Sequence, residues 1–178
     1  WQYQIQHLRQ ELNNFTEGRV FFEFSIPRMG KRADVILSLK NIIFILEYKV
    51  GASQGDRSGL DQVHDYALDL KNFHVGSHEC HIVPILIPTE TKQLYQVCQF
   101  EKDKVASPII ISPERLATIL SETLRAHNTS AVIPSDWSSS SYKPTPTIIE
   151  AAKTLFAGHS VKEITRSESG AINLDKTA

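Results

Sequence analysis

Charged side chains interrupt the most apolar stretch of this sequence, residues 32–51. Asp34 lies near one end of the stretch, and Glu47 and Lys49 lie near the other. Charged residues are depleted in strands and are rarely buried without a partner. Two acids could hold a hard divalent cation such as Mg²⁺, which prefers carboxylate and carbonyl oxygens. A metal-bound water has a lowered pKa, and a neighbouring lysine could position that water or neutralise charge that develops on a phosphate.

A β-hairpin with Lys40-Asn41 as its two central turn residues would bring these side chains together. In that register Asp34 faces Glu47, and Arg32 faces Lys49. The four side chains would share one face, with opposed Cβ atoms about 4.5–5.5 Å apart. Like charges would then oppose each other, which makes sense if a cation lies between the acids and an anion near the bases. The alternative is a solvent-facing side of a half-exposed hairpin, and a one-residue slip would separate the two acids.

The helix expected over residues 60–74 adds two polar side chains to this region. Gln62 and Tyr66 have i, i+4 spacing and therefore share one face of the helix. Glutamine can donate and accept hydrogen bonds, and tyrosine can donate one. Together they could hold a nucleotide or phosphate beside the metal, although Tyr66 could equally be a half-buried aromatic of the core.

The elements that must position these residues follow from the hydrophobic pattern. Alternating and continuous apolar runs predict strands, and apolar residues at helical spacing predict helices. The expected order is helix, three meandering strands, helix and strand, which is a mixed α/β arrangement. The expected elements span residues 2–15, 20–26, 32–39, 42–50, 60–74 and 81–88, followed by a strand at 108–112 and a helix at 113–127.

The charged residues and the order of the elements resemble a known group of enzymes. Asp34, followed by Glu47-Tyr48-Lys49 on the next strand, resembles the PD-(D/E)xK nuclease superfamily, although Ala33 replaces the proline of that pattern. Gln62 to Tyr66 is similar to the QxxxY motif of the RecB-like branch. Over about residues 20–88, the stretches FEFSIPRMGKRADVIL, ILEYKVG and DQVHDYALDLKNFH resemble the amino-terminal nuclease domain of bacterial Schlafen-group-3-like helicases.

This resemblance implies a fold and a metal site. The fold would be a restriction-endonuclease-like core, in which helices flank a mixed central sheet. Asp34 and Glu47 would bind Mg²⁺, for which Mn²⁺ could substitute, and the main-chain carbonyl of Tyr48 would complete the shell. Many members use a further acid, for which the candidates are Glu11 on the first helix and Glu23 on the neighbouring strand. Either could instead be an ordinary surface or paired carboxylate.

The remaining candidates would act on the substrate. By the same resemblance, Lys49 would be the catalytic base or charge stabiliser, and Gln62 and Tyr66 would support the substrate. Arg32 belongs to a basic cluster in the turn beside the proposed site. Such a cluster could contact the phosphate backbone, which positions a nucleic acid without reading its sequence, or it could simply be a solvated turn.

The sequence therefore predicts a metal-dependent nuclease that hydrolyses phosphodiester bonds. DNA is the expected substrate, within a larger helicase–nuclease that serves DNA processing or defence against foreign DNA. Two alternatives stay open. One is a nucleic-acid-binding module that does not cleave, and the other is an interaction or oligomerisation domain of a defence complex. The pattern leaves RNA or DNA, single or double strands, and endonucleolytic or exonucleolytic cutting undecided.

Length and composition set the remaining expectations. The chain has 178 residues and a net charge of −1, so binding of a polyanion must come from a local cluster. Two cysteines make no disulfide framework, which is typical of a cytoplasmic protein, and no apolar run reaches the ~18 residues of a membrane span. We expect a nuclease-like domain over residues 1–134. Residues 135–178 would be a Ser- and Pro-rich linker, a short helix near 147–157 and a tail leading to a downstream helicase domain.

Overall fold

The computed structural model describes residues 2–92, 96–127, 132–145, 148–149 and 152. The chain divides into two compact units, Trp1–Lys143 and Pro144–Ala178. The short helix expected near residues 147–157 falls largely outside the described residues. No helix among the described ranges is long and apolar enough to cross a membrane.

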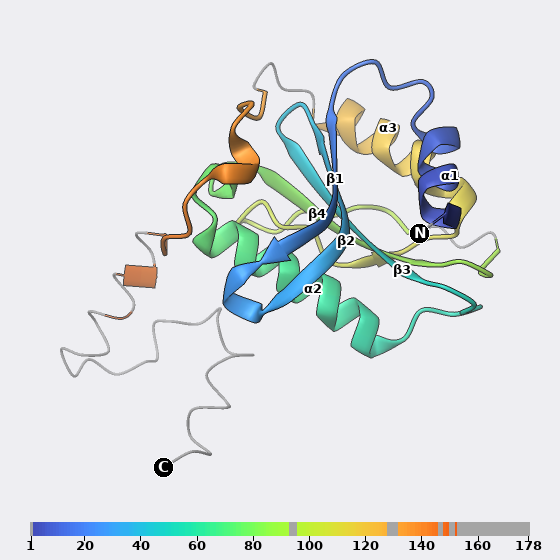
Figure 1. The fold of residues 1–178 in the computed structure, drawn as a ribbon, viewed down its shortest axis with the longest axis horizontal. Helices are drawn as coiled ribbons and strands as arrows, with labels where there is room; N and C mark the ends of the chain where they lie inside the picture. The colour runs from blue at the N-terminus through green and yellow to red at the C-terminus, as the bar shows by residue number, and fades with distance from the viewer. Residues whose placement is uncertain (1, 93–95, 128–131, 146–147, 150–151, 153–178) are drawn as a thin grey trace, which may run out of the picture. The chain divides into compact units, whose positions relative to one another are not determined.

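The first unit contains a five-stranded mixed sheet with helices on both faces, which confirms the predicted α/β class (Figure 1). The strands lie in the order β1-β2-β3-β4-β5; β1, β2 and β3 are antiparallel, whereas β4 and β5 run parallel to β3. The predicted order of helix, three strands, helix and strand is also observed. The bounds are α1 Gln2–Glu11, β1 Arg19–Ile26, β2 Lys31–Leu39, β3 Ile42–Lys49, α2 Arg57–Phe73, β4 His81–Pro88, β5 Ile109–Ile110 and α3 Leu116–Ala126.

The central strands are apolar on both sides because helices cover both sides of the sheet. In Figure 1, α1 and α3 lie together on one face and α2 lies on the other. Alternate residues of β3 divide between two cores: Phe44 and Leu46 pack with α1 and α3, whereas Ile43 and Ile45 pack with α2. Strands buried on both faces read as continuous hydrophobic runs. This explains why the only charges in β3, those of Glu47 and Lys49, stand at its carboxyl end.

The hairpin of β2 and β3 has the predicted register. Leu39 pairs with Ile42, and the pairing continues to Val35 and Leu46. The connection between the strands is Lys40-Asn41, and Lys40 adopts a left-handed backbone with φ 53°. The turn on which the interpretation of the charged residues depended is therefore confirmed.

The Ser-rich stretch that begins at residue 135 is not a surface linker over its first part. Trp137 is fully buried, and its Nε1 donates a hydrogen bond to Ser77 Oγ at 3.0 Å. Tyr142 forms a bridge to His74 at the end of α2. The first compact unit accordingly continues to Lys143. Composition suggested a linker here because serine and proline outnumber the two aromatic side chains that anchor the segment.

Candidate functional site

The candidate site lies where β2 and β3 separate. Their pairing ends at Val35 and Leu46. Beyond this point β2 continues only beside β1, and β3 continues only beside β4, where Glu47 pairs with Leu86. Asp34 and Glu47 are thus the first residues past the last pair of the hairpin. Both acids therefore stand at the point where the two strands part.

Asp34 fixes the start of this separation through its side chain. Its Oδ2 accepts a hydrogen bond from the backbone N–H of Tyr48 at 2.9 Å, so a side chain satisfies a donor that the hairpin ladder leaves behind. The pKa of Asp34 is raised, chiefly because the carboxyl is partly buried and also because Glu23 is near. The Tyr48 N–H and the charge of Lys49 act in the opposite direction.

Glu47 is the most perturbed acid of the site. It is only 6% exposed, and its Oε1 accepts a hydrogen bond from Gln62 Nε2 at 2.8 Å. Burial, followed by the charge of Asp34, raises its pKa to about 7, against the opposing effects of Lys49, the Asp34 backbone and Gln62. Its second oxygen, Oε2, is buried and has no hydrogen-bond partner. A buried carboxylate oxygen without a partner is costly, which marks it as an acceptor for a ligand.

Gln62 joins the acid to the base. Its Oε1 accepts from Lys49 Nζ at 3.2 Å, and its Nε2 donates to both Glu47 Oε1 and Tyr66 Oη at 2.8 Å. The Lys49 ammonium lies 3.8 Å from the same Glu47 oxygen. The predicted i, i+4 pair of α2 therefore faces the predicted acid and lysine of β3. The helix begins next to the site, where the Asp56 side chain caps it by accepting from the Gly59 N–H at 2.7 Å.

The structure does not form the predicted pair of Arg32 and Lys49 across the hairpin. Arg32 pairs with Ser25 of β1, whereas Lys49 pairs with Pro88 of β4, because the two strands have already separated. The Arg32 side chain is 67% exposed and lies 3.3 Å from Glu23 Oε2. Its predicted contact with substrate would have to be made from that exposed position.

The two further candidate acids, Glu11 and Glu23, have different surroundings in the structure. Glu11 Oε2 accepts from the backbone N–H of Ala117 at 2.9 Å, so this acid docks α1 against α3. Glu23 stands on β1 beside Asp34, raises its pKa and has a left-handed backbone with φ 50°. Between the two candidates, the geometry brings Glu23 to Asp34 and engages Glu11 elsewhere.

Sequence reasoning missed Gln4, which α1 presents to Asp34. Gln4 is 6% exposed, and its Nε2 lies 3.5 Å from Asp34 Oδ2. Hydrophobicity alone would place the apolar Ile5 on the buried side of this helix, but Ile5 is 37% exposed, and the buried side contains Gln4, His7 and Leu8. Gln4 and Leu8 have i, i+4 spacing and therefore lie on one face of the helix. Hydrophobicity alone does not indicate that face, because Gln4 is polar and the adjacent Ile5 is apolar.

The backbone of Tyr48 contacts the site, whereas its side chain belongs to the core under α1 and α3. While its backbone N–H holds Asp34, its side chain packs on the face covered by α1 and α3. The hydroxyl lies 2.9 Å from His7 Nδ1, and His7 Nε2 lies 2.9 Å from the carbonyl oxygen of Pro113. Because that carbonyl can only accept, Nε2 carries a proton. Tyr48, which lies between the predicted acid and lysine, is thereby linked to α1 and to the 3-10 helix Pro113–Arg115 that precedes α3.

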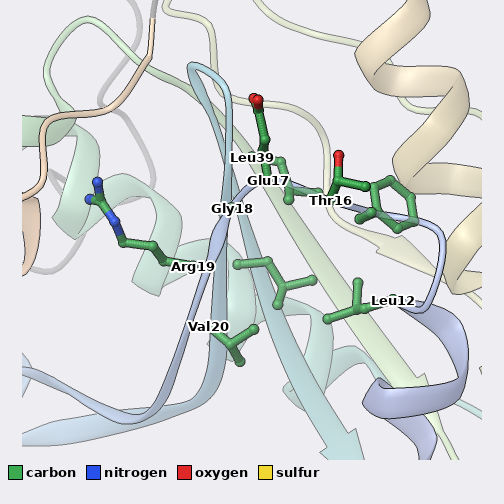
Figure 2. A pocket seen from close by; sticks show the side chains of 9 residues that line it. Leu12, Thr16, Glu17, Gly18, Arg19, Val20 and Leu39 are labelled. Carbon is green, nitrogen blue, oxygen red and sulfur yellow. The ribbon is translucent and has the colours of Figure 1, made fainter.

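Two cavities lie near these elements. One, of about 450 Å³, is lined by Gln62 and by polar residues of β2 and α2, namely Lys31, Arg57, Ser58, Asp61 and Asp65. It opens beside the amide that links Glu47 to Lys49. The other, of about 150 Å³, lies under the connection between α1 and β1, with Leu12, Gly18, Val20 and Leu39 among its lining residues (Figure 2). Gln62 is the one predicted site residue that lines the first cavity, and none of the predicted site residues lines the second.

The donor set fits a hard cation that keeps much of its water. Within the described ranges, no group of three or more His, Cys, Asp and Glu side chains is placed to hold a metal ion. Asp34 and Glu47 provide two carboxylates, and the unpartnered Glu47 Oε2 is available for coordination. Mg²⁺ is usually bound through one or two carboxylates and several waters.

The comparisons of this chain with protein-family models, with curated proteins and with solved structures find no match.

Proposed function

We propose that this chain is a metal-dependent nuclease domain that hydrolyses phosphodiester bonds of nucleic acid, with DNA as the first substrate to test. The observation that carries the proposal is the buried, unpartnered Glu47 Oε2, next to Asp34 and within a network that ends on Lys49. A buried acid with a strongly raised pKa and a specific cation beside it is typical of a functional site.

In this proposal Asp34, Glu47 and the main-chain carbonyl of Tyr48 would hold Mg²⁺. The bound ion would polarise the phosphate and lower the pKa of a water. Hydrolysis adds the water oxygen to phosphorus and breaks one phosphorus–oxygen ester bond, and the leaving oxygen takes up a proton. Lys49, held by Gln62, would orient the attacking water or neutralise the charge that develops on the phosphate.

The fold also supports this proposal. The observed order of helix, three strands, helix and strand agrees with the order expected from the resemblance to the restriction-endonuclease-like core. Both acids stand where the strands separate, and Gln62, which donates a hydrogen bond to Glu47, also lines the cavity of about 450 Å³. We further propose that the domain works beside a helicase domain in a longer chain, with a role in DNA processing or defence.

Cleavage assays test the nuclease directly. Plasmid DNA, single-stranded DNA and RNA are incubated with the chain and with Mg²⁺, Mn²⁺ or EDTA. Asp34→Ala and Lys49→Ala should each lower the cleavage rate by about a hundredfold or more, because each removes a group that acts on the reacting phosphate. Lys102→Ala, which removes an exposed lysine, should retain the wild-type rate. Equal rates in the wild type and both site variants would reject the proposal.

A second candidate function is a nucleic-acid-binding module that does not cleave. One observation favours it: the amide of Gln4 lies within hydrogen-bonding reach of Asp34, and both acids already accept hydrogen bonds. Such a module should bind DNA equally well in EDTA and in Mg²⁺, and long incubation should yield no product. Binding that requires the metal, together with cleavage, would exclude this candidate.

A further inference from the structure

Gln4 combines deep burial with an unsatisfied acceptor. It lies in the first turns of α1 and is 6% exposed, which is unusual for a glutamine. Its Nε2 is 3.5 Å from Asp34 Oδ2, at the outer limit of a hydrogen bond. Its Oε1 is buried and has no partner. One end of this amide is therefore weakly engaged, and the other end is not engaged at all.

Two buried acceptors of the proposed site have no hydrogen-bond partner. One is Glu47 Oε2 of β3, and the other is Gln4 Oε1 of α1, whose amide nitrogen lies 3.5 Å from Asp34 Oδ2. An unsatisfied buried acceptor costs about 1–3 kcal/mol, so each of them calls for an explanation. A cation bound at Asp34 would offer such oxygens a partner, because carboxylate and side-chain amide oxygens are both ligands of hard cations.

We propose that the carbonyl oxygen of Gln4 is a third, neutral ligand of the cation site formed by Asp34 and Glu47; this inference rests on the metal site of the proposed function. Rotation of the terminal amide exchanges its oxygen and nitrogen, so Oε1 can face the cation when Nε2 leaves Asp34. The site then has two negative side chains and one neutral one. Because α1 supplies a ligand, cation binding also holds the first turns of this helix against the sheet.

The alternative is that Gln4 only donates a hydrogen bond to Asp34. The two roles make opposite predictions for Gln4→Met, which removes both the oxygen and the hydrogens of the amide and adds no charge. A ligand role loses an oxygen, so Mn²⁺ should bind more weakly. A donor role only frees Asp34 Oδ2, so Mn²⁺ should bind at least as tightly as in the wild type.

The test is a titration of the 178-residue chain with Mn²⁺ alone at pH 8, followed by calorimetry and by the electron paramagnetic resonance signal of unbound Mn²⁺. Gln4→Glu should tighten binding about tenfold or more, since an additional charge near a cation contributes strongly in a poorly solvated site. Gln4→Met, which keeps the length and removes the oxygen, should weaken binding roughly tenfold. Gln6→Glu is the matched control, because Gln6 is exposed on the same helix, and its affinity should stay at the wild-type value.

Stability measurements supply a second readout and a check on folding. Without metal, Gln4→Glu should lower the melting temperature, because a third acid joins Asp34 and Glu47. With saturating Mn²⁺, the rise in melting temperature should be larger for Gln4→Glu than for the wild type, and smaller for Gln4→Met. If Gln4→Glu does not fold without metal, the affinity of Gln4→Met decides the question.

The outcomes separate this inference from the proposed function. Mn²⁺ binding that depends on Asp34 and Glu47 but is the same in the wild type and in both Gln4 variants would overturn the ligand role and leave the nuclease proposal intact. The expected changes in affinity without any cleavage of nucleic acid would support the ligand role and overturn the nuclease. A wild-type chain that binds no Mn²⁺ would overturn both.

Discussion

The side-chain amide of Gln62 donates to Glu47 Oε1 at 2.8 Å while its own oxygen accepts from Lys49 at 3.2 Å. The second hydrogen of the same nitrogen goes to the Tyr66 hydroxyl, also at 2.8 Å. One residue of α2 thus uses both donors and its acceptor to fix an acid, a base and a phenol. Because Glu47 is buried, the loss of this amide would leave its Oε1 without a donor, as its Oε2 already is.

We therefore expect Gln62→Leu to lower the free energy of unfolding by about 1–3 kcal/mol, the cost of leaving buried polar groups unpaired. Urea denaturation at pH 8 in EDTA measures this change. Gln10→Leu makes the same substitution at an exposed position of α1 and should alter stability by less than about 0.5 kcal/mol. A similar small effect in both variants would show that the amide network contributes nothing to the fold.

Glu47 should destabilise the chain in the absence of metal. Its pKa rises from 4.5 to about 7 on folding, first because of burial and then because of Asp34. Below pH 4.5 the carboxyl is protonated in both the folded and the unfolded state, and the penalty is absent. As the pH rises toward 7 the unfolded chain ionises first, so the penalty grows and is complete above pH 7.

Glu47→Gln should accordingly raise the free energy of unfolding at pH 8 in EDTA by up to about 3 kcal/mol, since each pKa unit corresponds to about 1.4 kcal/mol. At pH 4.5 the gain should nearly vanish. Denaturant titrations at the two pH values measure both quantities. Glu17→Gln, at an exposed position, should show neither effect, and a loss of stability at pH 8 in Glu47→Gln would contradict the raised pKa.

The segment around Trp137 should be required for the stability of the first unit. Its ring lies 5.1 Å from that of Phe24 and 5.2 Å from that of Phe21, between ring centroids. Trp137→Ala should lower the free energy of unfolding by about 3–5 kcal/mol, because a large cavity would remain. The matched control is Ser138→Ala, which changes the exposed side chain of the next residue and should leave the free energy of unfolding unchanged. If Trp137→Ala were equally neutral, residues 135–143 would be the linker that their composition suggests.

The sequence predicted the hairpin register from the two apolar runs that flank Lys40-Asn41, and the pairing from Leu39–Ile42 to Val35–Leu46 confirms it over a one-residue slip. This register places Asp34 and Glu47 directly after the last pair of the hairpin. The sequence placed Arg32 wrongly opposite Lys49, because a pattern along two strands does not show where the strands separate. Separation depends on β1 and β4, which take over the pairing of β2 and β3 at that point.

The other differences arise where polar residues are buried through tertiary contacts. Gln4 and His7 occupy the buried side of α1 because Asp34, Tyr48 and Pro113 offer them partners across the fold. These partners are distant in sequence, so no local sequence pattern indicates that Gln4 and His7 are buried. Trp137 is similar, since it packs against the rings of Phe21 and Phe24 in β1 and of His74 after α2, which are distant in sequence.

The buried His74 should make the stability depend on pH. Its side chain is fully buried, its Nδ1 lies 2.7 Å from Ser77 Oγ, and its Nε2 has no partner. Burial, assisted by the neighbouring His78 and opposed by a backbone hydrogen bond of Trp137, lowers its pKa from 6.5 to about 4. The unfolded chain thus takes up a proton near pH 6.5, whereas the folded chain resists protonation until about pH 4.

The sign follows from this difference. The contribution of His74 to stability is fully present above pH 6.5 and is lost as the pH falls toward 4, by about 3 kcal/mol in total. Urea denaturation at pH 7.5 and at pH 4.5 measures this contribution in the wild type and in His74→Gln. The decrease in the free energy of unfolding from pH 7.5 to pH 4.5 should be smaller by about 2–3 kcal/mol in His74→Gln than in the wild type. His64→Gln removes a half-exposed histidine from α2 and should keep the wild-type difference. Parallel losses in His74→Gln and the wild type would mean that His74 is not held neutral by its burial among the rings of Phe24, Trp137 and Tyr142.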